Sequence, residues 1–420
     1  MLTKIVHNSP KLCAFLNPLI ESLSEPQRQH LRDLCDALLV CESEHTLAAL
    51  QRQFVETTDA SNWADFPRIS PWSAQSVRAE LIEAPISFAI EQGQKSCQAR
   101  EIYLNIDDSL GEKNRATWRL EVVDIHHDHT RGTPKQPRYI NGFCYLVCTM
   151  RVGEVVATLD LQLYLRARTV RAINRQRGAE ERVCFRGKNT IAREILKRIA
   201  PHLPDGWTVI VQFDSWYASN KLLKFIHRQQ WQSTCGVKFN RNLDGVSLDT
   251  HNRKLKHKWH DRVIVSTAEG ETSYFVHQLD GRFTDLSIDL RVLISKRRLG
   301  QKRPAYFAST RLSCKPQAIL QGYSGRWSCE VVNFYTQTKL GIEDFRLWRY
   351  EAVDRYLVAV HLAWAHVERR FVEERGPQIK CYGDLMPTSR RTRRSLAGSG
   401  CQDDTKRSVA RSSVAALSTP

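Results

Sequence analysis

Two apolar, strand-like segments of this chain run directly into aspartate, and no other feature constrains the fold as strongly. The segments are IYLNIDDS, which reaches Asp107 and Asp108, and WTVIVQFDSW, which reaches Asp214. Aliphatic and aromatic runs of this length, bounded by polar residues, are typical of strands in a buried sheet. We therefore expect a sheet that presents acidic side chains where these two strands end.

A third carboxylate belongs to a downstream segment, QGYSGRWSCEVVNFY, which we predict to be helical. At about 100° per residue, offsets of three and seven return to nearly the same side of a helix. Tyr323, Arg326 and Glu330 have these offsets and should share one face. That face would carry a carboxylate, a guanidinium and a phenol together.

Carboxylates that converge from two strands and a helix match the needs of a divalent cation. Mg²⁺ prefers hard oxygen ligands and usually holds a substrate phosphate between them. The pattern indicates phosphoryl transfer on a polyanion, with Arg326 neutralising a phosphate and Tyr323 donating a hydrogen bond. Taken alone, Arg326 and Glu330 could instead form an ion pair along one helix, with Tyr323 as core filler.

The charge balance favours nucleic acid as that polyanion. The chain has 62 Lys and Arg against 45 Asp and Glu, a net charge of +17, and clusters occur at residues 254–258 and 296–298. A basic tail alone would explain only part of this excess. Twelve Cys without a CxxC pair and a polar N-terminal segment indicate a reduced, cytoplasmic, soluble protein. The most apolar segment, 356–367, is too short to span a bilayer.

Hydrophobic periodicity divides the chain into five regions. Residues 1–92 are expected to form short helices, either a domain that binds DNA ends or a cap on the core. Residues 93–239 give three sequentially paired strands, a helix, and then strand, helix and strand, the order of a ribonuclease-H-like mixed sheet. Residues 240–312 look like an all-β insertion, 313–375 complete the core, and 376–420 form a basic, disordered tail. The predicted class is α+β.

The motifs resemble those of DDE transposases of bacterial insertion sequences, in the broad IS4-like and IS701-like group. The likeness runs from about residue 101 to residue 365. Its strongest element is Tyr323-x₂-Arg326-x₃-Glu330, and the other parts are Phe334, Tyr335, Leu340-Gly341, Asp107-Asp108-Ser109 and Asp214-Ser215.

One position departs from the pattern of that family. The family signature continues to a Lys seven residues after the Glu, and here that position is Gln337, with Lys339 two residues on. A helix rotates Lys339 roughly 200° away from Gln337, so Lys339 could substitute only where the helix has ended or bent.

The resemblance implies an enzyme that cuts and joins DNA at insertion-sequence ends. Asp108, Asp214 and Glu330 would be catalytic and would hold two Mg²⁺ or Mn²⁺ ions. Asp107 is the alternate first aspartate, since neighbouring strand residues face opposite ways. Arg326, Tyr323 and Lys339 would contact DNA phosphates.

The partners implied are double-stranded DNA, as element ends and target, and a second copy of the chain in a synaptic complex within the cytoplasm at the nucleoid. Two alternatives stay open: a degenerate transposase that binds DNA without cutting it, and a structure-specific nuclease on the same fold.

Three further groups of residues carry weaker signals. Lys256, Lys258 and Trp259 lie together in the insertion and could hold DNA, with the ring stacking on a base, although Trp259 could equally anchor the β subdomain. A transition-metal site at residues 126–129 (HHDH) is disfavoured because adjacent side chains of an extended chain point apart, so a polar loop near DNA is expected there. Trp216 should pack under the active site.

Overall fold

A mixed sheet forms the centre of the molecule in the computed structural model, which describes residues 4–56, 59–117, 119–128, 131–133, 136–255, 260–267 and 270–376. Within that part of the chain the sheet has ten strands in the order β2-β3-β1-β5-β6-β12-β11-β10-β9, and β4 pairs with β3 off this path. The strands are β1 (Glu101–Glu112), β2 (Asp124–Asp128), β3 (Arg138–Val152), β4 (Val155–Tyr164), β5 (Thr208–Phe213), β6 (Gln232–Gly236), β9 (Asp261–Thr267), β10 (Gly270–Arg282), β11 (Asp289–Lys296) and β12 (Ala305–Ser309).

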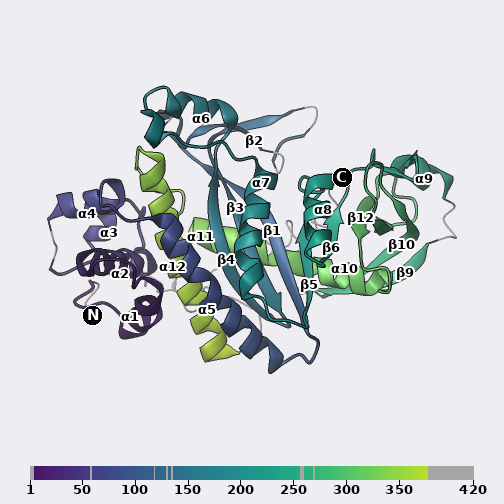
Figure 1. The fold of residues 1–420 in the computed structure, drawn as a ribbon, viewed down its shortest axis with the longest axis horizontal. Helices are drawn as coiled ribbons and strands as arrows, with labels where there is room; N and C mark the ends of the chain where they lie inside the picture. The colour runs from purple at the N-terminus through teal and green to yellow at the C-terminus, as the bar shows by residue number, and fades with distance from the viewer. Residues whose placement is uncertain are drawn as a thin grey trace, which may run out of the picture.

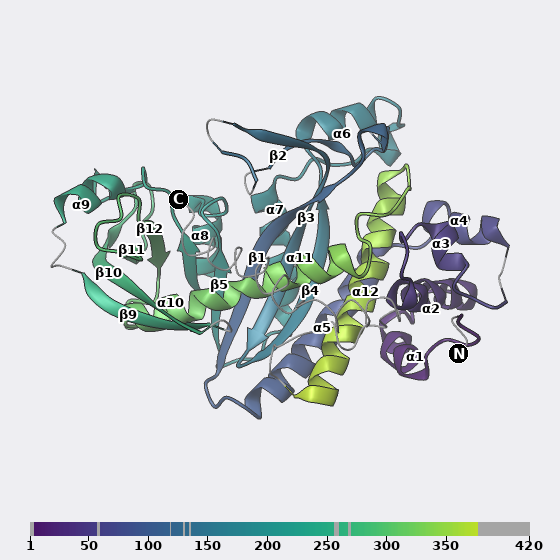
Figure 2. The same cartoon turned by 180° about the vertical axis from the view of Figure 1, so that it is seen from behind.

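Helices cover this sheet and extend from one end of it (Figures 1 and 2). They are α1 (Pro10–Leu16), α2 (Glu25–Val40), α3 (Leu47–Gln51), α4 (Ala60–Arg68), α5 (Ala74–Gln94), α6 (Ala167–Asn174), α7 (Lys188–Ile199), α8 (Asn220–Arg228), α9 (Leu248–Lys254), α10 (Pro316–Ser324), α11 (Ser328–Thr338) and α12 (Tyr350–Arg375). No helix among the described residues is long and apolar enough to cross a membrane.

The strand directions make the sheet mixed, as predicted. β1 is antiparallel to β3 and parallel to β5, which is parallel to β6. The parallel pair β5 and β6 needs a crossover, and α8 supplies it. β3 and β4 form a hairpin whose turn includes Gly153, at a φ of +54° that suits glycine. A mixed sheet with flanking helices confirms the α+β, ribonuclease-H-like prediction.

Alternating side chains bury both faces of the central strands. Leu146, Cys148 and Met150 of β3 point to the face covered by α7, which lies in front of the sheet in Figure 1. Tyr145 and Val147 point to the other face, where α11 crosses the strands, in front in Figure 2. Neighbouring residues of a central strand therefore face different helices, one α7 and the next α11.

The first four helices form a lobe on α12 (Figure 1). They share one hydrophobic core with α12, to which Trp63 and Trp72 contribute. Arg355 of α12 donates to the carbonyl oxygens of Trp72 and Pro67, each at 3.0 Å. This packing suits the cap alternative for the N-terminal region. The predicted boundary at residue 92 falls inside α5, which packs mainly on β4 and α12 and also contacts the lobe at Asn17–Leu19.

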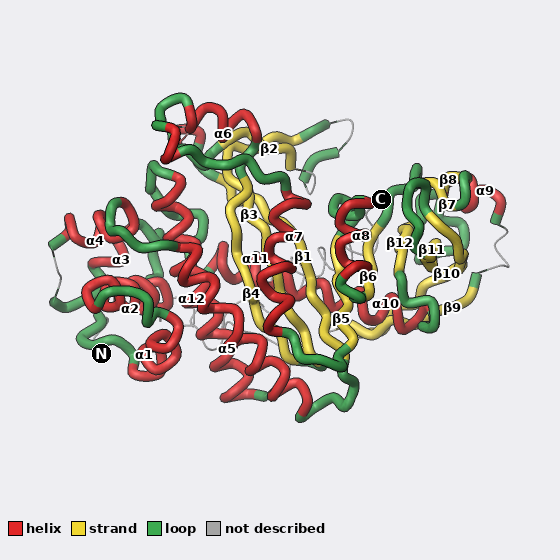
Figure 3. Tube along the Cα trace, viewed as in Figure 1, coloured by secondary structure: helices red, strands yellow, loops and turns green. Residues whose placement is uncertain are grey.

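The insertion extends the central sheet and also contains a helix. β12 is antiparallel to β6, with Phe307 opposite Gly236, and β11, β10 and β9 follow in order. The described part includes α9 and the two-stranded β7 (Asn242–Leu243) and β8 (Val246–Ser247), so "all-β" was too narrow. Figure 3 shows these strands, in yellow, at the end of the molecule opposite the N-terminal lobe. The predicted tail from residue 377 onward lies outside the described residues.

Candidate active site

The parallel pairing of β1 and β5 ends at the two predicted aspartates. Its last pair is Ile106 with Phe213, so Asp107 and Asp214 are the next residues of their strands. The sequence suggested that this strand ends at the aspartates. Instead, β1 continues to Glu112, and beyond Ile106 it pairs with β3 alone.

Strand parity selects the face on which these carboxylates lie. Asn105 and Gln212 are paired one step earlier, and paired residues point to the same face. The amide nitrogen of Asn105 donates to the Ser328 hydroxyl at 3.1 Å, which identifies this face as the one covered by α11. Side chains alternate along a strand, so Asp107 returns to this face.

Asp107 forms an ion pair with Arg326, whose side chain is almost completely buried. Burial raises the pKa of Asp107, and the negative charge of Asp108 adds to this, whereas the guanidinium of Arg326 opposes it. A second observation is that the Arg326 Nε is buried without a hydrogen-bond partner. The guanidinium therefore has a donor to spare beside the carboxylates.

Asp214 and Glu330 complete a group of interacting acids. Burial raises the pKa of Asp214 to about 6 and that of Glu330 to about 7. The next largest cause for both is repulsion from Asp107, and Arg326 lowers both values. The three acids thus share one electrostatic environment, in which each carboxylate disfavours ionisation of the others.

Asp108 points to the opposite face and has other partners. Its carboxylate accepts from the Lys188 ammonium at 2.7 Å and from the Tyr217 hydroxyl at 2.8 Å. The Cys144 thiol lies on the same side, 3.7 Å away. The sequence pattern favoured Asp108 as the first acid. In the structure the charge of Asp107 affects the pKa of Asp214 and Glu330 more than that of Asp108 does, and Asp108 forms an ion pair with Lys188.

The chemistry of the donor set suits a hard cation, since it consists of three carboxylates. Within the described ranges, however, no three His, Cys, Asp or Glu side chains are close enough together to hold a metal ion. Arg326 forms an ion pair with one of these carboxylates, Asp107. Raised pKa values at Asp214 and Glu330 are the expected result when buried acids lack sufficient counter-charge.

The sequence predicted one regular helix for the segment that carries Tyr323, Arg326 and Glu330, and this prediction is wrong. Tyr323 lies in the last turn of α10, Arg326 in a 3₁₀ turn (Gly325–Trp327), and Glu330 in the first turn of α11. The Tyr323 hydroxyl is buried and donates to the Phe213 carbonyl oxygen at 3.2 Å. Tyr323 therefore supports the end of β5 rather than facing a phosphate, which matches the core alternative for this residue.

Gln337, at the position where the family has Lys, connects α11 to β1. Its amide donates to the Ser109 hydroxyl and to the Leu110 carbonyl oxygen, both at 3.2 Å. α11 ends at Thr338, so Lys339 lies just beyond the helix, which is the condition under which it could replace the missing Lys.

Several predicted residues fall elsewhere. Lys256, Lys258 and Trp259 lie outside the described residues. His126, His127 and Asp128 belong to the edge strand β2 and not to a loop, because they pair with β3. Burial lowers the pKa of His126 to about 4, so its imidazole is neutral.

Three residues near the acids were missed or misjudged by sequence reasoning. Lys188 and Tyr217 hold Asp108, and no local motif marks them, because the contacts join segments far apart in the chain. Trp216 was expected to be buried, but 52% of it is exposed. Trp216 directly follows Asp214-Ser215, where the apolar strand has already ended, and this position could have indicated an exposed side chain.

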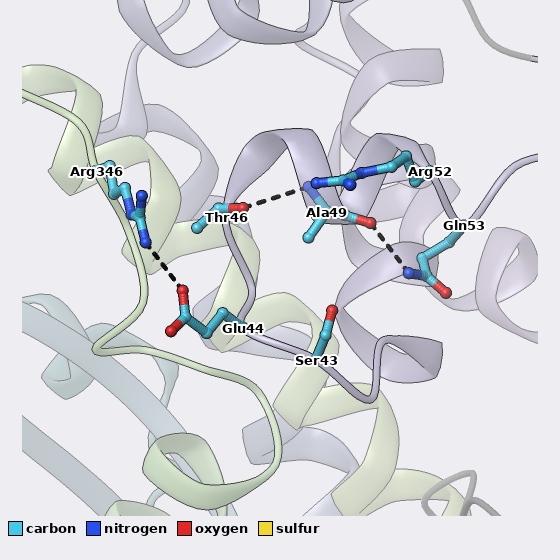
Figure 4. Close-up of a pocket in the computed structure, with 7 residues that line it drawn as sticks. All are labelled: Ser43, Glu44, Thr46, Ala49, Arg52, Gln53 and Arg346. Carbon is cyan, nitrogen blue, oxygen red and sulfur yellow. Dashed lines mark hydrogen bonds and ion pairs between the residues drawn. The ribbon is translucent and has the colours of Figure 1, made fainter.

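A pocket of about 520 Å³ lies away from these acids, between the N-terminal lobe and the segment before α12 (Figure 4). Glu44 and Arg346 form an ion pair across it at 3.0 Å, and Thr46 accepts from the Ala49 amide at 3.3 Å. The ion-paired Glu44 and Arg346 are exposed, and Arg52 donates to the Ala48 carbonyl oxygen, so the pocket does not share the chemistry of the carboxylate group.

Comparisons with known proteins point to the same region. The family described as DDE superfamily endonuclease matches residues 18–254, which include Asp107, Asp108 and Asp214. The family of the archaeal transposase ISC1217 matches residues 159–373, which include Asp214 and Glu330. No curated protein sequence matches the chain significantly.

Proposed function

The chain belongs to the DDE superfamily of endonucleases, and from this premise we propose that it is a transposase that cuts insertion-sequence ends and transfers the cut strand to target DNA. The observation that carries the proposal is the register of β1 and β5. Its last pair, Ile106 with Phe213, directly precedes Asp107 and Asp214, and the charge of Glu330 on α11 interacts with both of these carboxylates. The catalytic acids proposed are Asp107, Asp214 and Glu330.

Asp107 is preferred to Asp108 as the first acid for two reasons. Repulsion from Asp107 is the largest charge effect on both Asp214 and Glu330. Asp108 is occupied by Lys188 and Tyr217 on the other face of the sheet. Asp108 would then fix the strand so that Asp107 keeps its direction.

Two Mg²⁺ or Mn²⁺ ions are the cofactors that this set of oxygens would take. When bound, such ions supply an activated water and neutralise charge on the phosphate. Asp214 and Glu330 must first lose the protons that burial favours. Arg326 must leave Asp107, and its guanidinium is then available to pair with a phosphate of the DNA.

A DNA-binding relic without cleavage activity is the second candidate. The ion pair of Arg326 with Asp107 favours it, because that contact occupies a carboxylate that catalysis needs. The net charge of +17 supports double-stranded DNA as the partner under both candidates. A second copy of the chain would hold the other DNA end.

Purified protein and DNA carrying the element ends provide the test. The ends can be identified as inverted repeats that flank the gene. We expect cleavage with Mg²⁺ or Mn²⁺, and loss of cleavage by at least about a hundredfold in Asp107→Asn, Asp214→Asn and Glu330→Gln, with DNA binding kept. Asp108→Asn is the matched control for the first acid and should retain more activity than Asp107→Asn.

Different results would separate the candidates. Binding of the ends without any nick in the wild type would exclude the enzyme and support the relic. Cutting of branched DNA irrespective of end sequence would support the nuclease. Full loss in Asp108→Asn together with normal activity in Asp107→Asn would contradict the assignment of the first acid.

A further inference from the structure

Three polar side chains are buried together beside the proposed catalytic acids. They are Asn105 of β1, Thr149 of β3 and Ser328 at the start of α11, and none is more than 3% exposed. The Asn105 amide nitrogen donates to the Thr149 hydroxyl at 3.2 Å and to the Ser328 hydroxyl at 3.1 Å. The two hydroxyls are 2.7 Å apart, so each of the three groups is hydrogen-bonded to the other two. We call this set the helix anchor, because it ties α11 to two strands of the sheet.

The helix anchor lies two residues from a proposed catalytic acid on each of two segments of the chain. Asn105 precedes Asp107 by two residues on β1, so both side chains lie on the same face of the sheet. Ser328 precedes Glu330 by two residues in the first turn of α11. Between them, the Cys329 thiol donates to the Asn105 carbonyl oxygen at 3.6 Å. The helix anchor therefore holds the backbone that carries Glu330 against the backbone that carries Asp107.

The hydrogen bonding of the helix anchor is not the arrangement that stability alone would favour. The Asn105 Oδ1 is buried and has no hydrogen-bond partner among the described residues. The same holds for the Oε1 of Gln212, the residue paired with Asn105 in β5. A buried polar atom without a partner costs free energy, and an apolar residue in place of Asn105 would avoid that cost. An amide at this position is explained if its two donors are needed to hold Thr149 and Ser328 in one geometry.

We propose that Asn105, Thr149 and Ser328 are positioning residues, which set the place of Glu330 relative to Asp107 for binding of the divalent cation. The inference rests on the proposed function for the roles of the two acids. Metal affinity depends strongly on residues that orient the ligands without touching the ion. With both backbones fixed, only the carboxylate side chains have to move to enclose an ion, so less conformational entropy is lost on binding.

Binding of Mn²⁺ to the whole protein without DNA, measured by calorimetry, tests the positioning role apart from cleavage. Thr149→Val keeps the shape of the side chain and removes its hydroxyl, and Ser328→Ala removes the hydroxyl on the helix. We expect both variants to bind Mn²⁺ about tenfold more weakly than the wild type. Thr149→Ser keeps the hydroxyl and should bind within about twofold of the wild type. Asp214→Asn should abolish the binding, which identifies the site.

Two further measurements separate positioning from a general loss of stability. Ser247→Ala is the matched control, since the Ser247 hydroxyl also pairs with a threonine at a helix start, 2.8 Å from the Thr250 hydroxyl in α9. It should lower the melting temperature without weakening Mn²⁺ binding. Hydrogen exchange of backbone amides is the second measurement: Ser328→Ala should speed exchange in the first turn of α11 and leave exchange in α12 unchanged.

Unchanged Mn²⁺ binding in Thr149→Val and Ser328→Ala would overturn the proposal, as would an equal loss of binding in Ser247→Ala. A wild type that binds no Mn²⁺ would also overturn it. Failure of the proposed function gives a different result: Asp214-dependent Mn²⁺ binding that weakens in Ser328→Ala, with DNA ends left uncut, supports the helix anchor and excludes the transposase. If the wild type cuts DNA and Ser328→Ala cuts it at the same rate with the same Mn²⁺ requirement, the transposase stands and the helix anchor is refuted.

Discussion

At the scale of single residues, the site concentrates acidic side chains that the fold does not fully compensate. Glu330 and Asp214 have pKa values of about 7 and about 6, mainly through burial and secondarily through Asp107. Arg326 offsets part of this cost. Such acids are costly for stability at neutral pH, and their retention is understandable if they bind a cation.

Removing one of these charges should make the protein more stable. A carboxyl group with a raised pKa stabilises the fold in its neutral form, so this contribution is complete below about pH 4.5 and is lost as the pH rises through about 7. Glu330→Gln should therefore raise the free energy of unfolding by about 1–3 kcal/mol at pH 8 and hardly change it at pH 4. Urea unfolding at both pH values measures this. The exposed Glu91→Gln is the control, and a gain for Glu330→Gln that is equal at both pH values would contradict the argument.

The same pKa values predict how metal dependence varies with pH. Protons compete with the cation at Asp214 and Glu330, so the Mg²⁺ concentration needed for half-maximal cleavage should rise as the pH falls from 8 to 6. Titration of Mg²⁺ at several pH values checks this. A requirement that is independent of pH in this range would show that other groups hold the ion.

At the scale of elements, the helical segment after the insertion shows what sequence reasoning could and could not reach. Offsets of three and seven predicted one shared helical face for Tyr323, Arg326 and Glu330; the three residues lie in two helices and the turn between them, and the charge of Arg326 interacts with both of the others. The 3₁₀ turn at Gly325–Trp327 was not predicted, because it depends on how α10 and α11 pack on separate parts of the sheet. The core strands were predicted well because their apolar runs are long. β2 was missed because its sequence lacks an alternation of apolar and polar residues. The face of the sheet on which Asp107 and Asp108 each lie could be assigned only once the register of β1 and β5 was known.

Tyr323→Phe tests whether this residue supports β5 or contacts DNA. Loss of the hydrogen bond to the Phe213 carbonyl should lower the free energy of unfolding by about 1 kcal/mol and leave DNA affinity nearly unchanged. Thermal unfolding and a binding titration are measured together. A drop in affinity at unchanged stability would restore the phosphate role that the sequence suggested.

At the scale of the whole molecule, α12 joins the N-terminal lobe to the sheet. Beside it Arg78 of α5 is buried and bonds Asp354 at 2.6 Å, with Asp160 of β4 at 3.6 Å. We therefore expect the lobe, α5, α12 and β4 to unfold together. The sequence predicted that this region is helical. It did not predict that the region packs on the core, because the contacts join residues far apart in the chain, such as Arg78 and Asp354.

Arg78→Met should strongly destabilise the protein. It removes the arginine that pairs with Asp354 in the interior, which costs about 3–5 kcal/mol, whereas Asp160 keeps its ion pair with Arg198. Chemical unfolding should show a single transition at lower denaturant concentration. Arg68→Met, which removes an exposed pair with Asp65, is the control and should change stability by less than about 1 kcal/mol. Two separate transitions in the wild type would contradict a single unit.

The short ladder between β12 and β6 has a mechanical consequence. Cys235 of β6 bonds across to Ala308 on one side and lies opposite Phe213 on the other, one residue from Asp214. The paired strands β12, β6 and β5 therefore connect the insertion to the end of β5 without a break. A substitution that shifts β12 should also disturb the backbone one residue before Asp214.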